Sequence, residues 1–317
     1  MTVTVPALSE LLAGVSLEEP TRWKGLEVFP LIGPNGHAPS CALIDELLER
    51  HEAEIAEISE GGSVPTIKVL NRSDHDALVL DGTELHGARQ NRMVNLTIIA
   101  ARGAETIIPV SCVEAHRWSY RARRFSSSRH TVASRLRNLK AHRVAEHLAA
   151  SGAPTADQHE VWAQVGSYLA RGDAPSTTQA MDDVFTRHHD RVEDVAAGLD
   201  KLDAHGAMVA LHGDVVALDL FEHRDTFKRA WPSLLRGYAM DAVLEGQKPS
   251  KPMTRAAARR QLRGLMEKAM LTAHKVAGVG QYYAVRGSGI AGGVATHQGR
   301  TVHVALFPAC NQGTRVP

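Results

Sequence analysis

Polar and ionisable side chains crowd into the segment 81–92, directly after a short apolar stretch. They are Asp81, Glu84, His86, Arg89, Gln90, Asn91 and Arg92. Amide and guanidinium groups in one loop can hold a polyhydroxylated or phosphorylated ligand through directed hydrogen bonds. Loops on a rigid sheet often carry binding sites, so we expect Gln90, Asn91 and Arg92 to bind a ligand. The alternative is that these side chains satisfy backbone groups buried at a turn.

Three residues in or near this segment have acid–base or nucleophilic chemistry: Glu84, Cys112 and Glu114. Two carboxylates whose pKa values differ can divide the roles of general acid and general base, which makes Glu84 and Glu114 candidate catalytic residues. A cysteine nucleophile needs its thiolate form, which nearby cations favour. Cys112, close to Arg117, is therefore the third catalytic candidate. Its alternative is a place in the core, because it follows an apolar strand.

The run from Arg117 to Arg143 concentrates positive charge in a chain whose formal net charge is +1. It contains no Asp or Glu, and its cations are Arg117, Arg121, Arg123, Arg124, Arg129, Arg135, Arg137, Lys140 and Arg143. The planar guanidinium group suits two-point contact with phosphate or carboxylate. We therefore expect an anion to bind here.

Three serines follow the first arginines of this run. If a helix begins just after them, its free amides and the serine hydroxyls can meet a phosphate. The candidate anion-binding residues are Arg117, Arg121, Arg124, Ser126, Ser127 and Ser128. Two alternatives stay open: a solvated basic face, or pairing with the acidic helix expected around 182–194. The second basic segment, 255–263, has the same alternatives.

Metal-ligand spacing gives little indication of a metal site. No HExxH motif occurs, and His189 with Glu193 is the one pair at helical spacing that we note. We expect a solvated helix face there and assign no metal ligands. The Gly-rich segment 287–293 lacks the Gly-Lys-Ser/Thr of a P-loop, so we expect a strand bend, and any cofactor stays unknown.

Composition narrows the class of protein. Of the 317 residues, 44% are hydrophobic and 22% are charged, as in soluble globular proteins. Aromatic residues make up only 5%, which weakens single-strand nucleic-acid binding because bases stack on aromatic side chains. No stretch approaches the roughly 20 apolar residues that span a bilayer. Three cysteines without close pairing do not indicate a disulfide framework, so we expect a cytoplasmic protein with no membrane partner.

The first part of the chain, from about Leu26 to Tyr120, has the pattern of strands. The segment 66–70 alternates and is β-branched, and turn residues follow it at 71–76. Short strands at this spacing indicate a sandwich or barrel-like sheet. We expect a short helix over 42–48 capped by Ser40, and Pro109 should lie at an edge or end the strand pairing.

Helical patterns dominate from about Thr131 to Leu202, and a mixed region follows. The elements expected there are helices over 156–169 and 178–199, a hairpin of 208–211 with 215–218, a helix from Asp225 to Trp231, another opened by Pro232, a helix over 254–275, and strands over 282–285 and 301–307. The sequence therefore predicts an α+β fold: a β-rich N-terminal sheet, a helical middle region and C-terminal α/β elements.

The change of pattern along the chain suggests three regions. Residues 1–128 would form a β-rich domain with the polar loop and the arginine motif, residues 129–202 a helical region, and residues 203–317 an α+β region packed on the rest. One continuous domain is the alternative.

Three segments together resemble a known family: Leu80 to Arg92, Ile108 to Trp118, and Arg124 to Ser128. Asp219-Leu220-Phe221 and Trp231 fit as well. The order and spacing resemble a bacterial domain family named for its association with ADP-ribosylglycohydrolases and rhodanese/phosphatase-superfamily proteins. The resemblance implies a genomic setting near ADP-ribose and phosphate chemistry.

The sequence is compatible with three alternative functions. The first is binding or processing of a phosphorylated small molecule, such as an ADP-ribose-like nucleotide, in an arginine-rich cleft. The second is nucleic-acid binding through the two basic segments, which predicts a steep salt dependence. The third is a self-assembling scaffold, a homo-oligomer whose basic face meets an acidic face on a neighbouring copy.

Overall fold

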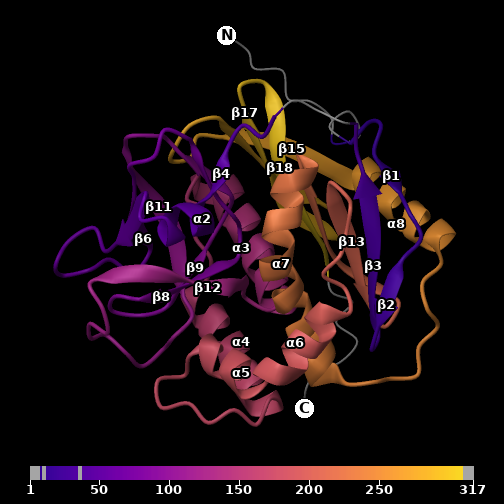
Figure 1. Ribbon diagram of the computed structural model, residues 1–317, viewed down its shortest axis with the longest axis horizontal. Helices are drawn as coiled ribbons and strands as arrows, with labels where there is room; N and C mark the ends of the chain where they lie inside the picture. The colour runs from indigo at the N-terminus through magenta and orange to yellow at the C-terminus, as the bar shows by residue number, and fades with distance from the viewer. Residues whose placement is uncertain (1–7, 9–11, 35–37, 310–317) are drawn as a thin grey trace.

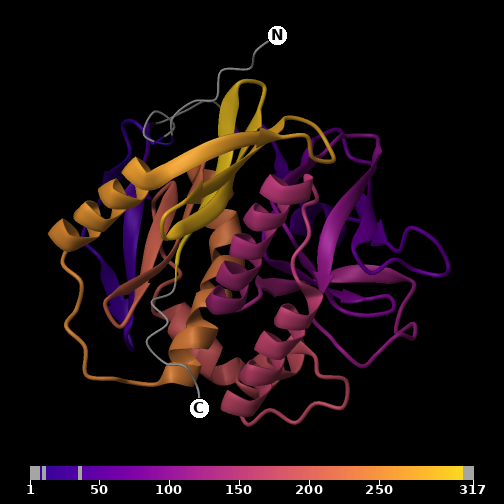
Figure 2. The same cartoon turned by 180° about the vertical axis from the view of Figure 1, so that it is seen from behind.

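The computed structural model describes residue 8 and residues 12–34 and 38–309. Helices lie between a barrel and a large sheet in Figures 1 and 2. The mixed α+β class predicted from the sequence is confirmed, including the barrel-like sheet in the N-terminal half. Within the described residues, no helix has the length and apolar character needed to cross a membrane.

The barrel is closed by six antiparallel strands in the order β11-β6-β5-β12-β8-β9. They are β5 (Ala53–Ala56), β6 (Thr66–Asn71), β8 (Thr83–Gly87), β9 (Arg92–Val94), β11 (Glu105–Cys112) and β12 (Arg124–Thr131). The alternation predicted over 66–70 is present, and its inward side chains Ile67 and Val69 are fully buried. Pro109 is the last residue of β11 paired with β6, and β11 continues on β9.

A nine-stranded antiparallel sheet forms the other half of the molecule. Its strands are β1 (Ser16–Leu17), β2 (Thr21–Trp23), β3 (Leu26–Ile32), β13 (Gly206–Leu211), β14 (Asp214–Phe221), β15 (Ala269–His274), β16 (Gln281–Gly287), β17 (Ile290–His297) and β18 (Arg300–Pro308). The strand β3 pairs with β13, so residues 16–32 lie in one sheet with the C-terminal strands. The three-region division stays a prediction.

The helices cover both faces of the large sheet. They are α2 (Ile44–Glu49), α3 (Ser134–Ser151), α4 (Gln158–Arg171), α5 (Met181–Arg187), α6 (His189–Ala197), α7 (Arg224–Glu245) and α8 (Arg255–Lys268). Helices α3 and α7 contact the sheet on the barrel side, and α7 also contacts β12. Apolar side chains of α8 pack with the opposite side of the sheet. Because both faces are covered, β13 is an unbroken apolar and buried run.

A small third sheet lies beside the barrel: β4 (Ala42–Leu43), β7 (Ala77–Val79) and β10 (Ile98–Ala100). The helix expected over 42–48 therefore starts two residues late. Ser40 does not cap it, because its hydroxyl donates to Glu222 Oε2 at 2.6 Å and Leu43 is the N-cap.

Four other expected elements differ from the structure. The helix over 178–199 is divided at His188 into α5 and α6. Pro232 lies inside the single helix α7, and His223, not Asp225, caps it. The helix over 254–275 ends at Lys268, and the chain continues as β15. The Gly-rich segment forms a turn and enters strand β17.

Buried ion pairs join α3 to the two halves of the molecule. Arg137 donates to Asp81 Oδ1 at 2.6 Å and to both carboxylate oxygens of Asp219, at 2.9 and 2.6 Å. Lys140 contacts Asp81 as well. Asp81 lies between β7 and the barrel strand β8, whereas Asp219 lies on β14. Because removing one partner of a buried ion pair is costly, this network favours one orientation of the barrel against the large sheet.

Candidate functional site

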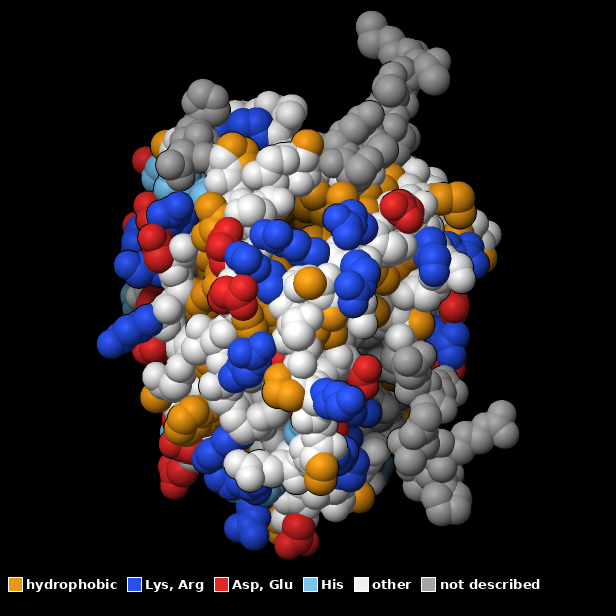
Figure 3. Space-filling model, turned by 90° about the vertical axis from the view of Figure 1, so that its right-hand side faces the viewer, with side chains coloured by type: hydrophobic (Ala, Val, Ile, Leu, Met, Phe, Trp, Pro, Cys, Tyr) orange, Lys and Arg blue, Asp and Glu red, His pale blue; other side chains and the backbone are white. Residues whose placement is uncertain are grey.

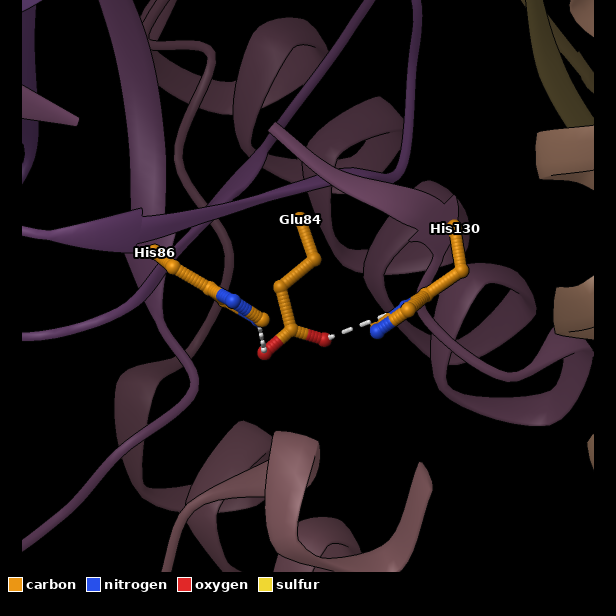
Figure 4. Close-up of side chains that lie close together, drawn as sticks. All are labelled: Glu84, His86 and His130. Atoms are coloured by element: carbon orange, nitrogen blue, oxygen red, sulfur yellow. Dashed lines mark ion pairs between the residues drawn. The ribbon is translucent and has the colours of Figure 1, made fainter. Parts of the chain in front are cut away.

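Two histidines and a glutamate meet at the wall of the barrel (Figure 4). Glu84 and His86 are two residues apart on β8, so their side chains leave the same face of that strand. His130 comes from the neighbouring strand β12, which pairs Ser127 with Leu85 and, after a register shift, Thr131 with Thr83. Such bulges re-aim side chains, and the shift lies at the residues that lead to His130.

Glu84 is the most unusual member of the cluster. Its side chain is fully buried, and neither carboxylate oxygen has a hydrogen-bond partner among the described residues. Two histidine nitrogens lie near it: His86 Nε2 is 3.7 Å from Oε1, and His130 Nδ1 is 3.8 Å from Oε2. Buried carboxylates are normally paired and hydrogen-bonded, because desolvation of the charge is costly. The geometry therefore favours a cation beside Glu84.

A second carboxylate, Asp182 in the first turn of α5, faces the same histidines. Its Oδ1 lies 3.1 Å from His86 Nε2 and 3.6 Å from His130 Nε2. In the sequence Asp182 belongs to the acidic helix expected around 182–194. The bridge between Glu114 and Ala180 instead brings the start of α5 against the barrel, and Asp182 faces inward.

The ring of His130 is held on two sides. Phe185 stacks on it with ring centroids 3.7 Å apart and an interplanar angle of 13°. His130 Nδ1 lies 3.2 Å from the carbonyl oxygen of Thr131. In the tautomer with the proton on Nδ1 this contact is a hydrogen bond, and Nε2, which faces Asp182, is the ring's electron-pair donor. This pairing is a common support of metal-binding histidines.

The electrostatics of the cluster also favour positive charge. Burial by itself lowers the pKa of His86, but contacts with Asp182 and Glu84 raise it to about 10. Burial raises the pKa of Asp182, but His130 and His86 hold it well below its ordinary value. Both carboxylates therefore favour a cation between the two rings.

The donor set matches that of transition-metal sites. One donor atom each from Glu84, His86 and His130 lies within 4.8 Å of the others. An ion about 2.0–2.2 Å from nitrogen and oxygen ligands requires ligands no more than about 4.4 Å apart, so small side-chain rotations suffice. Imidazole with carboxylate suits Zn²⁺, Fe²⁺ and Mn²⁺. The side chains of His86 and Asp182 are each 25% exposed, so the cluster opens to solvent on their side.

The other catalytic candidates lie in a separate network. Glu114 accepts hydrogen bonds from Arg117 Nε at 2.7 Å, from Arg117 Nη2 at 2.6 Å and from the backbone N–H of Asn91 at 3.0 Å. Burial alone raises the pKa of Glu114, but these donors lower it. Its oxygens are thus occupied within the protein, and the Arg117 guanidinium is held in an ion pair.

Arg92, Gln90 and Cys112 are buried together. Arg92 donates to Gln90 Oε1 at 3.0 Å and contacts the Cys112 sulfur. Burial raises the pKa of Cys112 to about 11, so the thiol is protonated at neutral pH and is a poor nucleophile. Cys41 is also free and buried, whereas Cys310 lies outside the described residues.

Most cations of the positive run form ion pairs with acidic side chains of the protein. Seven of its nine cations are paired: Arg117 with Glu114, Arg124 with Glu54, Arg129 with Glu49, Arg135 with Glu245, Arg137 with Asp81 and Asp219, Lys140 with Asp81, and Arg143 with Glu146 and Glu160. These acids do not come from the segment 182–194. The two cations outside these pairs are Arg121 and Arg123.

The three serines and the second basic segment lie on a strand and on a helix, respectively. Ser126, Ser127 and Ser128 belong to strand β12, and α3 begins only at Ser134, so no helix N-terminus follows them directly. Arg255 of α8 pairs with Glu18 and Glu19. The face of the molecule that includes α8 mixes basic, acidic and apolar side chains (Figure 3).

From the sequence we proposed Glu84 as a catalytic candidate but assigned no role to His86, His130 or Asp182. The motif Glu84-Leu85-His86 on a strand was the available signal, since alternate residues share a face. The position of His130 depends on the register shift in β12, and that of Asp182 on a bridge to residue 114. Neither is local in sequence.

The fold and the site together define an α+β protein with a closed barrel and a His/carboxylate cluster at its wall. Residues 14–307 match the family described as the ARG and Rhodanese-Phosphatase-superfamily-associated Protein domain. The match covers most of the chain, so the protein belongs to this family. No significant match was found among curated proteins or solved structures.

Proposed function

We propose that the protein binds a divalent transition-metal ion through Glu84, His86 and His130 and uses it to hydrolyse a phosphorylated small molecule. The observation that carries the proposal is the Glu84 carboxylate, which is fully buried and lacks a hydrogen-bond donor among the described residues. Two imidazole rings flank it. An ion in this position would satisfy both oxygens at once.

The site has the parts that metal-assisted hydrolysis needs. A bound ion polarises a phosphoryl oxygen and lowers the pKa of a bound water. Asp182 contacts both rings on the exposed side, where it can accept a hydrogen bond from that water. Water would add to phosphorus, the bond to the leaving oxygen would break with release of a phosphate anion, and the water proton would pass to solvent, because a carboxyl group with a lowered pKa does not retain it.

The family description supports one class of substrate. Its description associates this domain with ARG and with the rhodanese–phosphatase superfamily, which supports an ADP-ribose-like nucleotide as substrate. Nucleic-acid binding through the positive run is supported less well, because three of its cations, Arg117, Arg137 and Lys140, are held in buried ion pairs that are costly to break.

Metal binding by the variant Glu84→Gln tests the proposal. Titration calorimetry with Mn²⁺ and Zn²⁺ should give about one site per chain in the wild type. Loss of a second-sphere partner already lowers metal affinity about 10–100-fold, so loss of this ligand should lower it by about 100-fold or more. The matched control is Glu105→Gln, an exposed glutamate of the barrel strand β11. Equal affinity in Glu84→Gln and wild type would contradict the proposal.

Turnover is measured separately. Chromatography should show ADP-ribose cleaved by the metal-loaded wild type, with no cleavage after chelation or in Glu84→Gln. Metal binding without hydrolysis of ADP-ribose or related nucleoside diphosphates would contradict the hydrolase assignment and leave the metal site standing.

A further inference from the structure

The loop between β11 and β12 differs from its surroundings. It presents two aromatic side chains to solvent, Trp118 at 43% and Tyr120 at 46% exposure. Arg121 and Arg123 are also exposed, and within the described part of the chain no acidic side chain forms an ion pair with either. Among the cations of this run that the structure describes, these two carry no ion pair and can bind an anion without breaking one.

Backbone hydrogen bonds attach this loop to the two chain segments that follow His86 and precede Asp182. The N–H of Arg121 donates to the carbonyl of Ala88 at 3.0 Å, two residues beyond His86. The N–H of His116 donates to the carbonyl of Thr178 at 2.9 Å, close to Asp182. The loop is therefore attached to both segments whose side chains line the solvent-exposed edge of the cluster.

The aromatic rings are held before any ligand arrives. The guanidinium of Arg89 lies over the Tyr120 ring at 4.5 Å and over the Trp118 ring at 5.6 Å. The Tyr120 hydroxyl donates to the carbonyl of Glu60 at 3.1 Å. Rings fixed in this way lose little conformational freedom when a ligand stacks on them, which favours affinity.

We infer that this loop recognises a nucleoside diphosphate. The base stacks on the exposed surface of Trp118 and Tyr120, and the phosphates bind Arg121 and Arg123 by charge-assisted hydrogen bonds. The loop is attached by backbone hydrogen bonds to the segments next to His86 and Asp182, which supports delivery of the phosphates to the cluster. The inference rests on the proposed function for the fate of the phosphates, whereas recognition of the base stands on the loop alone.

The test measures binding of ADP and of ribose 5-phosphate, each with metal-loaded protein and with chelator. Trp118→Ala and Tyr120→Ala should each raise the dissociation constant for ADP about 5- to 150-fold, the range that corresponds to loss of one base–aromatic stack. Ribose 5-phosphate has no base, so its affinity should change less than twofold. The double variant Arg121→Ala/Arg123→Ala should weaken both ligands.

Matched controls separate recognition from folding. Trp23→Ala removes an exposed tryptophan whose ring also contacts a cation, that of Lys24. Trp23 lies far along the chain from the loop, on β2 of the large sheet. Arg102→Ala removes an exposed arginine at a barrel turn. Both should bind ADP like the wild type. Tyr120→Phe keeps the ring and its contact with Arg89 but loses the hydroxyl bond to Glu60, so it should bind ADP more tightly than Tyr120→Ala.

The outcomes distinguish the two proposals. If no metal binds but ADP affinity still depends on Trp118 and Tyr120, the proposed function fails and this inference holds. If metal binds at Glu84 but the aromatic variants bind ADP like the wild type, this inference fails. It is also overturned if inorganic phosphate binds as tightly as ADP, or if a single-stranded oligonucleotide binds more tightly with a steep salt dependence.

Discussion

At the scale of residues, Glu84 and Glu114 show how identical side chains take opposite roles. Both are fully buried. Glu114 accepts three hydrogen bonds from Arg117 and Asn91, whereas among the described residues Glu84 forms ion-pair contacts with two histidine rings and accepts no hydrogen bond. A carboxylate whose oxygens are already satisfied stabilises the fold. One whose oxygens lack donors can bind a cation from solution.

The ion pair of Glu114 predicts a pH-dependent stability. Because Arg117 and Asn91 lower the pKa of Glu114 in the folded state, its contribution is present above the unfolded pKa of about 4.3 and is lost as pH falls through the folded pKa. Glu114→Gln should cost about 3–5 kcal/mol of unfolding free energy at pH 7, as expected when a buried pair loses one partner.

Urea unfolding of wild type and Glu114→Gln from pH 7 to pH 3 checks this prediction. The difference in unfolding free energy should shrink as the pH falls below about 4.3. A difference that stays constant, or grows, with acidification would contradict the ion-pair account.

At this scale the sequence suggested candidate residues by their chemistry but could not assign their partners. It selected Glu84, Glu114 and Arg117 from their chemistry. That Arg117 neutralises Glu114, and that His130 reaches Glu84, depends on a register shift and on loop contacts between distant segments.

At the scale of elements, strand β12 and helix α7 together position His130. Gly237 of α7 packs against β12 so closely that a Cβ atom there would lie 2.3 Å from Thr131 Oγ1 and 2.8 Å from the Val132 carbonyl oxygen. Only glycine permits this approach. The close contact holds the end of β12 beyond its register shift, and His130 precedes Thr131 directly.

Gly237→Ala therefore tests how the helix supports the site. Overpacking of this kind typically costs about 1–3 kcal/mol, and displacement of β12 should also weaken metal binding. The control is Gly166→Ala in α4, where a Cβ atom would meet nothing within 4 Å and stability should rise by up to about 1 kcal/mol. Thermal unfolding and metal titration measure both effects. Unchanged metal affinity in Gly237→Ala would refute the positioning role of α7.

Local patterns predicted most strands and several helices, and they failed where tertiary contacts decide. Residues 269–274 continue a helical pattern, yet they pair with β16 along their whole length. Pro232 should end a helix, but α7 continues through it while its apolar residues, among them Trp231 and Leu235, pack in the core. The Gly-rich segment enters β17 because Gly293 leaves room for the Tyr282 ring, whose hydroxyl would lie 2.1 Å from a Cβ atom.

At the scale of the whole molecule, the order of segments along the chain conceals their arrangement. The first strands belong to the sheet of the C-terminal half, and the buried network of Arg137, Asp81 and Asp219 fixes that sheet against the barrel. The sequence predicted the α+β class and the barrel-like sheet from strand spacing. It could not predict that β3 pairs with β13, because local periodicity carries no information about partners that are distant in the chain.

X-ray absorption spectroscopy of the zinc-loaded protein tests the central claim most directly, because it reports the atoms that bind the ion. The account predicts nitrogen and oxygen ligands at about 2.0–2.2 Å, with two imidazole rings, and loss of the imidazole signal in the variant His86→Ala/His130→Ala. A thiolate sulfur at about 2.3 Å, or a spectrum unchanged in that variant, would contradict it.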